Sequence, residues 1–194
     1  MSRVTWRGST LLSPVPAALV TVGTGERANI LTVAWCGIVC SQPPMTYISV
    51  RPQRHSYAIL KEEREFVIHL TNRALVRATD YCGIYTGAKV NKFEKCGLTA
   101  IPSSAVSVPT IEEAPLALEC RVREIIPLGT HDMFLADILA TTVRDELLDE
   151  AGKLCLDRAD LTAYSHGTYY SLGQPLGSFG FSAAKRRPGR PKRK

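Results

Sequence analysis

The chain has 194 residues, of which 45% are hydrophobic and 22% are charged, close to the proportions of an average globular domain. This length fits one domain with a short appendage, and the composition excludes a disordered chain, a collagen-like repeat and a membrane protein with several spans. The net charge of +6 is uneven, because the last ten residues hold seven positive charges and leave the rest nearly neutral. We therefore predict a domain over residues 1–184 and a basic disordered tail over residues 185–194.

The six cysteines are too sparse for a secreted scaffold held by disulfides. Cys36 and Cys40 are four residues apart, but no second close pair accompanies them, so we expect no metal site and reduced, mostly buried thiols. Two prolines interrupt the apolar stretch between Leu11 and Val22, which argues against a signal peptide or a membrane span. We expect a cytoplasmic protein without a membrane partner.

Strand patterns dominate the chain. The expected strands are Ala17–Val22, Asn29–Cys40, Thr46–Val50, Glu65–Leu70, Leu116–Ile125 and Met133–Val143. Helices are expected over Tyr57–Glu63, with Ser56 as the N-cap, and over Leu75–Tyr85. In the strand after Leu116, apolar residues alternate with Glu119, Arg121 and Arg123, which places these three charged residues on the polar face.

The order of these elements lacks regular alternation of strands and helices, so a doubly wound parallel sheet is not expected. No Gly-x-Gly-x-x-Gly sequence follows a strand, which argues against a Rossmann dinucleotide site. We predict a mostly β fold, a β-barrel with helices packed outside it.

The first segment that can hold a cofactor is the strand from Asn29 to Gly37 with the small residues that end it. Its backbone N–H and C=O groups suit a planar heteroaromatic ring that needs several donors and acceptors. An ordinary core strand before the turn Ser41-Gln42-Pro43-Pro44 explains the same pattern, and the pattern alone favours that simpler interpretation.

Two arginines, Arg51 and Arg54, stand just before the helix that Ser56 is expected to cap. Two guanidinium groups, a hydroxyl and the free amides of a helix N-terminus suit a phosphate. A solvated basic turn explains the pattern equally well.

A second anion contact is possible between Thr86 and Phe93. Thr86 and Gly87 supply a hydroxyl and a flexible backbone, and Lys89 and Lys92 supply positive charge three residues apart. A lysine-bearing surface loop is the commoner explanation of such a segment.

His131 lies in the expected turn between the last two long strands. It can donate to a cofactor or transfer a proton near neutral pH, or it can be a surface histidine hydrogen-bonded to Asp132. The sequence contains neither Gly-x-Ser-x-Gly nor a Walker-type phosphate loop, which argues against hydrolases and NTPases.

Taken in order, these segments resemble the flavin reductase-like proteins of the FMN-binding split-barrel fold, especially the flavoredoxin branch. The similarity runs from about Pro14 to Phe181, and the order and spacing of its motifs carry it. The matching stretches are Asn29–Pro44, Arg51–Tyr57, Thr86–Phe93, Gly129–Phe134, Tyr169–Gly173 and Leu176–Gly180.

The resemblance implies a homodimeric split barrel that binds FMN non-covalently near the dimer interface. It also implies an FMN-dependent oxidoreductase, with NADH or NADPH as co-substrate or a redox protein as partner. The cofactor-binding residues that it implies are Thr32, Ala34, Trp35 and Cys36 beside the flavin ring, Arg51, Arg54 and Ser56 at the phosphate, and Thr86, Gly87, Lys89 and Lys92 in the following loop. His131 lies where some members place a histidine beside the nicotinamide, so it is the expected catalytic residue.

The segment Arg187–Lys194 resembles an AT-hook, whose core is Gly-Arg-Pro flanked by basic residues. The resemblance implies binding in the narrow minor groove of A·T-rich DNA. A basic tail with weak, salt-dependent affinity for polyanions is the simpler interpretation. The alternative to an oxidoreductase is therefore a non-catalytic FMN-binding or DNA-associated module.

Overall fold

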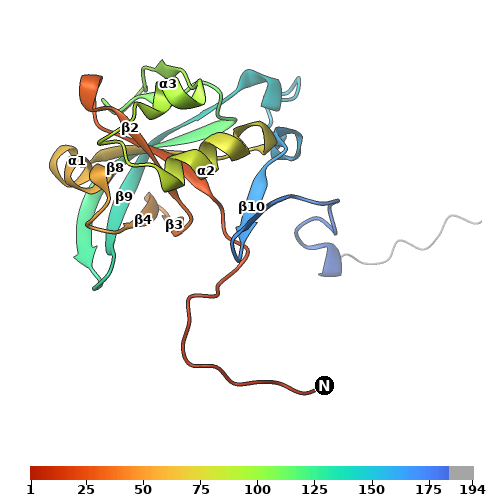
Figure 1. Ribbon diagram of the computed structural model, residues 1–194. Coiled ribbons are helices and arrows are strands. Elements are labelled where there is room, and N and C mark those ends of the chain that lie inside the picture. The colour runs from red at the N-terminus through yellow and green to blue at the C-terminus, as the bar shows by residue number, and fades with distance from the viewer. Residues whose placement is uncertain (184–194) are drawn as a thin grey trace, which may run out of the picture.

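The computed structural model describes residues 1–183, and the expected basic tail lies outside the described residues (Figure 1). Its centre is one antiparallel sheet of seven strands, β1 (Ala18–Val22), β2 (Asn29–Val33), β3 (Cys36–Ser41), β4 (Pro44–Val50), β5 (Glu65–His69), β8 (Leu116–Pro127) and β9 (Asp132–Val143). Two short hairpins, β6 (Ala100–Ile101) with β7 (Thr110–Ile111) and β10 (Thr162–Ser165) with β11 (Thr168–Ser171), lie outside this sheet. The helices are α1 (His55–Glu63), α2 (Val76–Ile84) and α3 (Lys92–Cys96).

The strand order β2-β1-β5-β8-β9-β4-β3 forces the sheet to curl. Its two outermost strands, β2 and β3, are consecutive in the chain and are joined only by Ala34 and Trp35. In a flat sheet these strands would lie roughly 29 Å apart, at about 4.8 Å per strand. The link of three Cα–Cα steps spans at most about 11 Å, so the two edges must approach each other at this corner. Within the described residues β2 and β3 do not pair, so the curled sheet stays open and the closed barrel expected from the sequence is not formed.

The inner face of the curl holds the larger hydrophobic core. Apolar side chains from six strands meet there with Ile59 and Leu60 of α1, and Phe66 and Phe134 are its largest fully buried members. A second core lies on the other face of β1 and β2, where Leu19 and Ile30 pack against α2. Figure 1 shows α2 and α3 together over this face of the sheet. The helices α2 and α3 thus cover the outside of the curled sheet, as the sequence predicts, whereas α1 contributes to the inner core.

The expectation of a mostly β fold is confirmed, and most of the expected elements lie within two residues of their predicted bounds. The prediction of one strand over Asn29–Cys40 is wrong, because the chain leaves one sheet edge at Ala34 and enters the other at Cys36. The prediction that Ser56 caps the first helix is also wrong. The helix begins at His55, Arg54 occupies the N-cap position, and Ser56 is buried.

The cysteines are all free, as expected, but they are less buried than the sequence predicts. Cys82 and Cys120 are buried, while the other four are only half-buried. The short helix α3 and the hairpin of β10 and β11 have no counterpart among the expected elements, because both are too short to show a hydrophobic period. No helix within residues 1–183 is long and apolar enough to span a bilayer.

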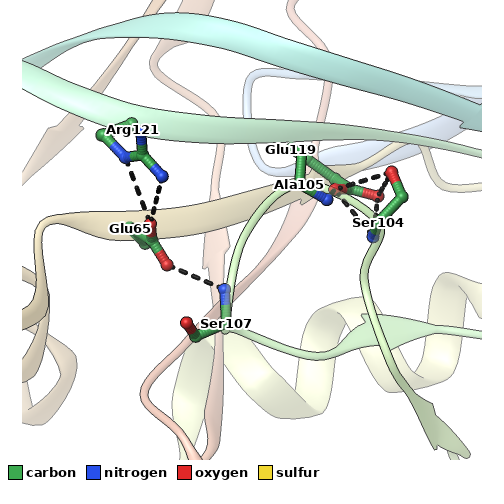
Figure 2. Close-up of polar contacts among 6 residues, drawn as sticks. All are labelled: Glu65, Ser104, Ala105, Ser107, Glu119 and Arg121. Carbon is green, nitrogen blue, oxygen red and sulfur yellow. Dashed lines mark hydrogen bonds and ion pairs between the residues drawn. The ribbon is translucent and has the colours of Figure 1, made fainter.

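Glu119 differs from the other charged residues of its strand. The alternation in β8 predicts an outward side chain, yet Glu119 is fully buried beneath the loop that follows β6. Figure 2 shows its carboxylate accepting hydrogen bonds from the backbone N–H groups of Ser104 and Ala105 and from the Ser104 hydroxyl. On the neighbouring strand, Glu65 accepts from the Ser107 N–H at 2.8 Å and from Arg121. Two carboxylates therefore fasten this loop to the sheet.

We expect Glu119→Gln to lower the free energy of unfolding by about 2 kcal/mol, because the new amide would turn N–H donors toward the N–H groups of a buried site. Glu65→Gln is the matched control, since it changes a less buried carboxylate that holds the same loop. Its expected cost is about 0.5 kcal/mol. Urea unfolding of the two variants measures both values. Equal losses would contradict the role assigned to the buried carboxylate.

Candidate functional site

The corner where the sheet edges meet carries a cleft of about 210 Å³. One side of the cleft is formed by the end of β2 and by the link of Ala34 and Trp35. The other side is formed by the end of β4, the turn that follows it and the turn before β9. The residues that line it are Leu31, Thr32, Val33, Ala34, Trp35, Ser49, Val50, Arg51, Arg54 and His131. Six residues singled out in the sequence, up to 99 positions apart, lie together here: Thr32, Ala34, Trp35, Arg51, Arg54 and His131.

The rings of Trp35 and His131 pack against each other in the lining of this cleft. Their ring centroids are 4.7 Å apart and their planes are inclined by 39°. The Nδ1 of His131 lies 3.0 Å from the Thr130 hydroxyl, whereas Asp132 accepts a hydrogen bond from Tyr57. Burial, and then the positive charge of Arg51, lower the pKa of His131 below its ordinary value. A neutral imidazole, with one donor and one acceptor, therefore stands at the cleft near pH 7.

Arg54 lines both this cleft and a second hollow beside it. That hollow has a volume of about 240 Å³, and Thr32, Ala34 and Arg54 line both. One guanidinium nitrogen of Arg54 donates to the Gly83 carbonyl at 2.8 Å, which ties the residue before α1 to the last turn of α2. Arg54 is exposed, so its other N–H groups are accessible to a ligand.

A larger cavity, of about 820 Å³, lies on the other side of the α1 N-terminus. The first residue of the helix, His55, faces Gly87 and Lys89 across it, and Arg27 and Asn29 also line it. A Cβ atom at Gly87 would collide with the Asn29 side chain, so only glycine lets this loop approach β2 so closely. Of the residues expected to bind the phosphate, Gly87 and Lys89 line this cavity, whereas Arg51 and Arg54 line the corner cleft. Thr86 is exposed in the same loop.

Three of the expected site residues are turned into the protein instead. Lys92 is buried and donates to the carbonyls of Ile30 at 2.6 Å and Cys82 at 2.8 Å, and burial lowers its pKa. Ser56 is buried and accepts from Asn29 at 2.7 Å. Cys36 packs against the larger core, and burial raises its pKa to about 11. These three support the walls of the site, and none lines the clefts described above.

Sequence reasoning missed the far wall of the second hollow. Tyr164 and Tyr169 of the β10–β11 hairpin line it with Asp80 and Gly83 of α2. Burial, and then Asp80, raise the pKa of Tyr169 to about 12, so its hydroxyl remains a donor. A tyrosine-rich strand far along the chain carries no local signal for this role. Sequence reasoning also left Asn29 out of the expected site residues, although it could have included it, because Asn29 begins the first segment considered as a cofactor site.

Residues 11–173 of the chain match the family model of the flavin reductase like domain. Among solved structures, the flavoredoxin of Desulfovibrio vulgaris (Miyazaki F) superposes with a TM-score of 0.86 and is 31% identical. That similarity covers 94% of this chain and 100% of the flavoredoxin chain.

Among curated proteins, an uncharacterized protein of Pyrococcus abyssi is 32% identical over 146 residues, which cover 75% of this chain and 83% of the relative. An NADPH-flavin oxidoreductase of Streptomyces viridifaciens is 28% identical over 135 residues, which cover 69% of each chain. The match to the family model thus spans every residue that lines the corner cleft and both adjoining cavities.

Proposed function

Because the chain belongs to the flavin reductase-like domain family, we propose that it is an FMN-dependent oxidoreductase of flavin reductase or flavoredoxin type. In this proposal, reducing equivalents pass from NADH, NADPH or a redox protein through non-covalent FMN. The observation that carries the proposal is the corner cleft, where Trp35, Arg51, Arg54 and His131 converge on the end of β2.

The residues present fit a flavin nucleotide. A ring needs a flat, partly apolar slot with nearby backbone donors and acceptors, and the link of Ala34 and Trp35 is irregular backbone beside an aromatic side chain. A phosphate needs cationic groups and free amides, and Arg54, the α1 N-terminus and Lys89 supply them around the neighbouring cavities. Gly87 permits the close backbone approach that such a cradle requires.

FMN, when bound, supplies the hydride or electron chemistry, so the protein needs no nucleophile of its own. In the proposed site, Thr32, Ala34 and Trp35 hold the ring and Arg51 places positive charge beside it. Arg54, Lys89 and the loop at Thr86 and Gly87 bind the phosphate. His131 orients the reductant, while Lys92 and Ser56 hold the walls in place through Ile30, Cys82 and Asn29.

The first test is the visible absorbance spectrum of the purified protein reconstituted with FMN, recorded without oxygen before and after NADH or NADPH is added. We expect a protein-bound flavin spectrum that bleaches with one of the two nucleotides. A bound flavin that stays oxidised with both would support an electron carrier supplied by a redox protein. No bound flavin would contradict the proposal.

We expect His131→Ala to leave FMN affinity within about twofold but to slow reduction by NADH or NADPH about tenfold. The imidazole packs against Trp35 at the cleft and offers a hydrogen bond to an incoming ring, and its loss removes both. Stopped-flow reduction and FMN titration measure the two effects. Thr130→Ala is the control, since it removes only the Nδ1 partner. Loss of FMN from His131→Ala would instead make this residue part of the cofactor site.

We also propose that the protein is a homodimer built on the edge strand β3. Ile38 and Val39 are 65% and 50% exposed on this strand, and Trp35, 41% exposed, adjoins them. An exposed apolar strand edge next to the cleft favours pairing with a second copy, which would complete the site. Light scattering of the purified protein should give twice the chain mass of 21.3 kDa. A monomer at micromolar concentration would contradict this assembly.

A further inference from the structure

Two free cysteines lie close together behind the proposed cofactor site. The Sγ of Cys82 in α2 lies 3.9 Å from the Sγ of Cys96 in α3. A disulfide requires about 2.05 Å between the sulfurs, so a small movement of the two side chains separates this contact from a bond. Of the six cysteines, these two are the pair whose sulfurs are in contact within the described residues.

The two thiols differ in access to solvent. Cys82 is fully buried in the core between α2 and the sheet, and burial raises its pKa above the ordinary value. Cys96 is half-buried and lines a cavity of about 460 Å³. The same cavity is lined by three cations, Arg77, Lys95 and Arg144, and by one carboxylate, Glu113, which is held by the Thr99 N–H.

We propose that Cys96 and Cys82 form a hydroperoxide-sensitive dithiol that closes to a reversible intramolecular disulfide. Cys96 is reached first, because it is only half-buried and lines an open cavity, whereas Cys82 is fully buried. Its sulfur attacks the terminal oxygen of the hydroperoxide and the O–O bond breaks. The sulfur becomes a sulfenic acid, and the remainder of the hydroperoxide leaves as an alcohol or water. The Cys82 sulfur then attacks the Cys96 sulfur and expels the hydroxyl as water, so two thiols are oxidised as one peroxide is reduced.

The same turn of α2 holds two residues of the cofactor site. The carbonyl of Cys82 accepts from Lys92, which also holds Ile30 of β2, and the carbonyl of Gly83 accepts from Arg54. Drawing the Cys82 side chain toward α3 would shift the anchor of Arg54. We therefore expect the disulfide to weaken FMN binding at least threefold, a consequence that rests on the proposed function.

The test begins with the reduced, full-length protein treated with hydrogen peroxide and then with iodoacetamide. The number of alkylated thiols should fall by two from the six present, and dithiothreitol should restore it. Trypsin should yield a linked pair of peptides, 78–89 and 96–121, with fragmentation placing the bond on Cys96 and not on Cys120. Cys96→Ser should abolish the link and Cys155→Ser should keep it.

A link to any other cysteine, a link between chains, or Cys96 oxidised to sulfinic acid without a link overturns the dithiol. The wild-type peptide map decides this even where Cys96→Ser fails to fold. FMN is then titrated into the reduced and the oxidised protein. Equal affinities overturn the coupling to Arg54. Failure of the reduced protein to bind FMN overturns that coupling together with the proposed function, while the mapped disulfide stands by itself.

Discussion

Arg54→Ala should weaken FMN binding by about 1.5–3 kcal/mol, or roughly 10- to 150-fold in Kd, the usual cost of losing a charge-assisted hydrogen bond. Arg54 is the residue for which the largest binding effect is expected, because it alone of the site cations lines both small hollows. Its position before α1 also adds its charge to the free amides of the helix N-terminus. Quenching of flavin fluorescence on titration measures the Kd.

Two variants make this result specific to the site. Arg73→Ala removes an exposed arginine that pairs with Asp160 away from the cleft, and it should leave the Kd unchanged. Arg54→Lys keeps the charge but loses the planar fork, so its Kd should fall between those of the wild type and Arg54→Ala. Because Arg54 is exposed, added salt should screen its charge and reduce the difference in Kd between the wild type and Arg54→Ala. Unchanged affinity in Arg54→Ala would remove this residue from the site.

The expected site residues that line the cleft and its neighbouring cavities are those whose position depends on local geometry. Arg51 and Arg54 precede a helix, and an arginine before a helix N-terminus lies near its free amides in any fold. His131 occupies a turn between two long strands whose alternation is plain in the sequence. Gly87 was assigned for the flexibility of its backbone, and the structure adds the contact with Asn29 that requires it.

The errors arise where a distant segment decides what covers a residue. Alternation in β8 correctly separates the two faces of the strand, but it does not reveal that a loop lies over Glu119 on the polar face. Lys92 has polar neighbours in sequence and nothing there shows that two carbonyls, from β2 and α2, receive its ammonium group. Both residues look like solvated charges until the tertiary contacts are known, because burial of a paired charge leaves no periodic signal.

The broken strand at Ala34 and Trp35 has a similar origin. Asn29–Cys40 is mostly apolar and no polar residue marks the break at Ala34 and Trp35, so its composition shows no boundary there. Only the strand order reveals that the chain crosses from one sheet edge to the other. This crossing places Trp35 opposite His131, and therefore creates the cleft. The fold class follows from local patterns, whereas the cleft follows from the approach of the two sheet edges at the two residues that link them.

Acid should destabilise the fold through His69, by about 3 kcal/mol between pH 6.5 and pH 4. His69 is fully buried, its Nδ1 lies 3.1 Å from the Leu19 carbonyl, and its Nε2 accepts from the Ile111 N–H at 2.9 Å. These partners require the neutral ring with its proton on Nδ1. Burial lowers the pKa to about 4, and the hydrogen bond to Leu19 opposes that shift only in part.

The sign follows from proton binding. In the unfolded chain His69 takes up a proton near pH 6.5, whereas the folded protein resists it until about pH 4. Between these values the unfolded state binds more protons, so the free energy of unfolding decreases as the pH falls, by up to about 1.4 kcal/mol per pH unit. Above pH 6.5 the histidine adds no pH dependence.

Urea unfolding of the wild type and of His69→Gln across this range isolates the effect. His69→Gln should be less stable at pH 7, because the amide fits the two partners less well, but its stability should fall less steeply with acid. His166→Asn is the control, since it changes an exposed histidine in the turn between β10 and β11 and should retain the wild-type slope. Carboxylates titrate in every variant, so the difference in slope carries the result. Parallel curves for the wild type and His69→Gln would show that His69 becomes protonated within the folded protein.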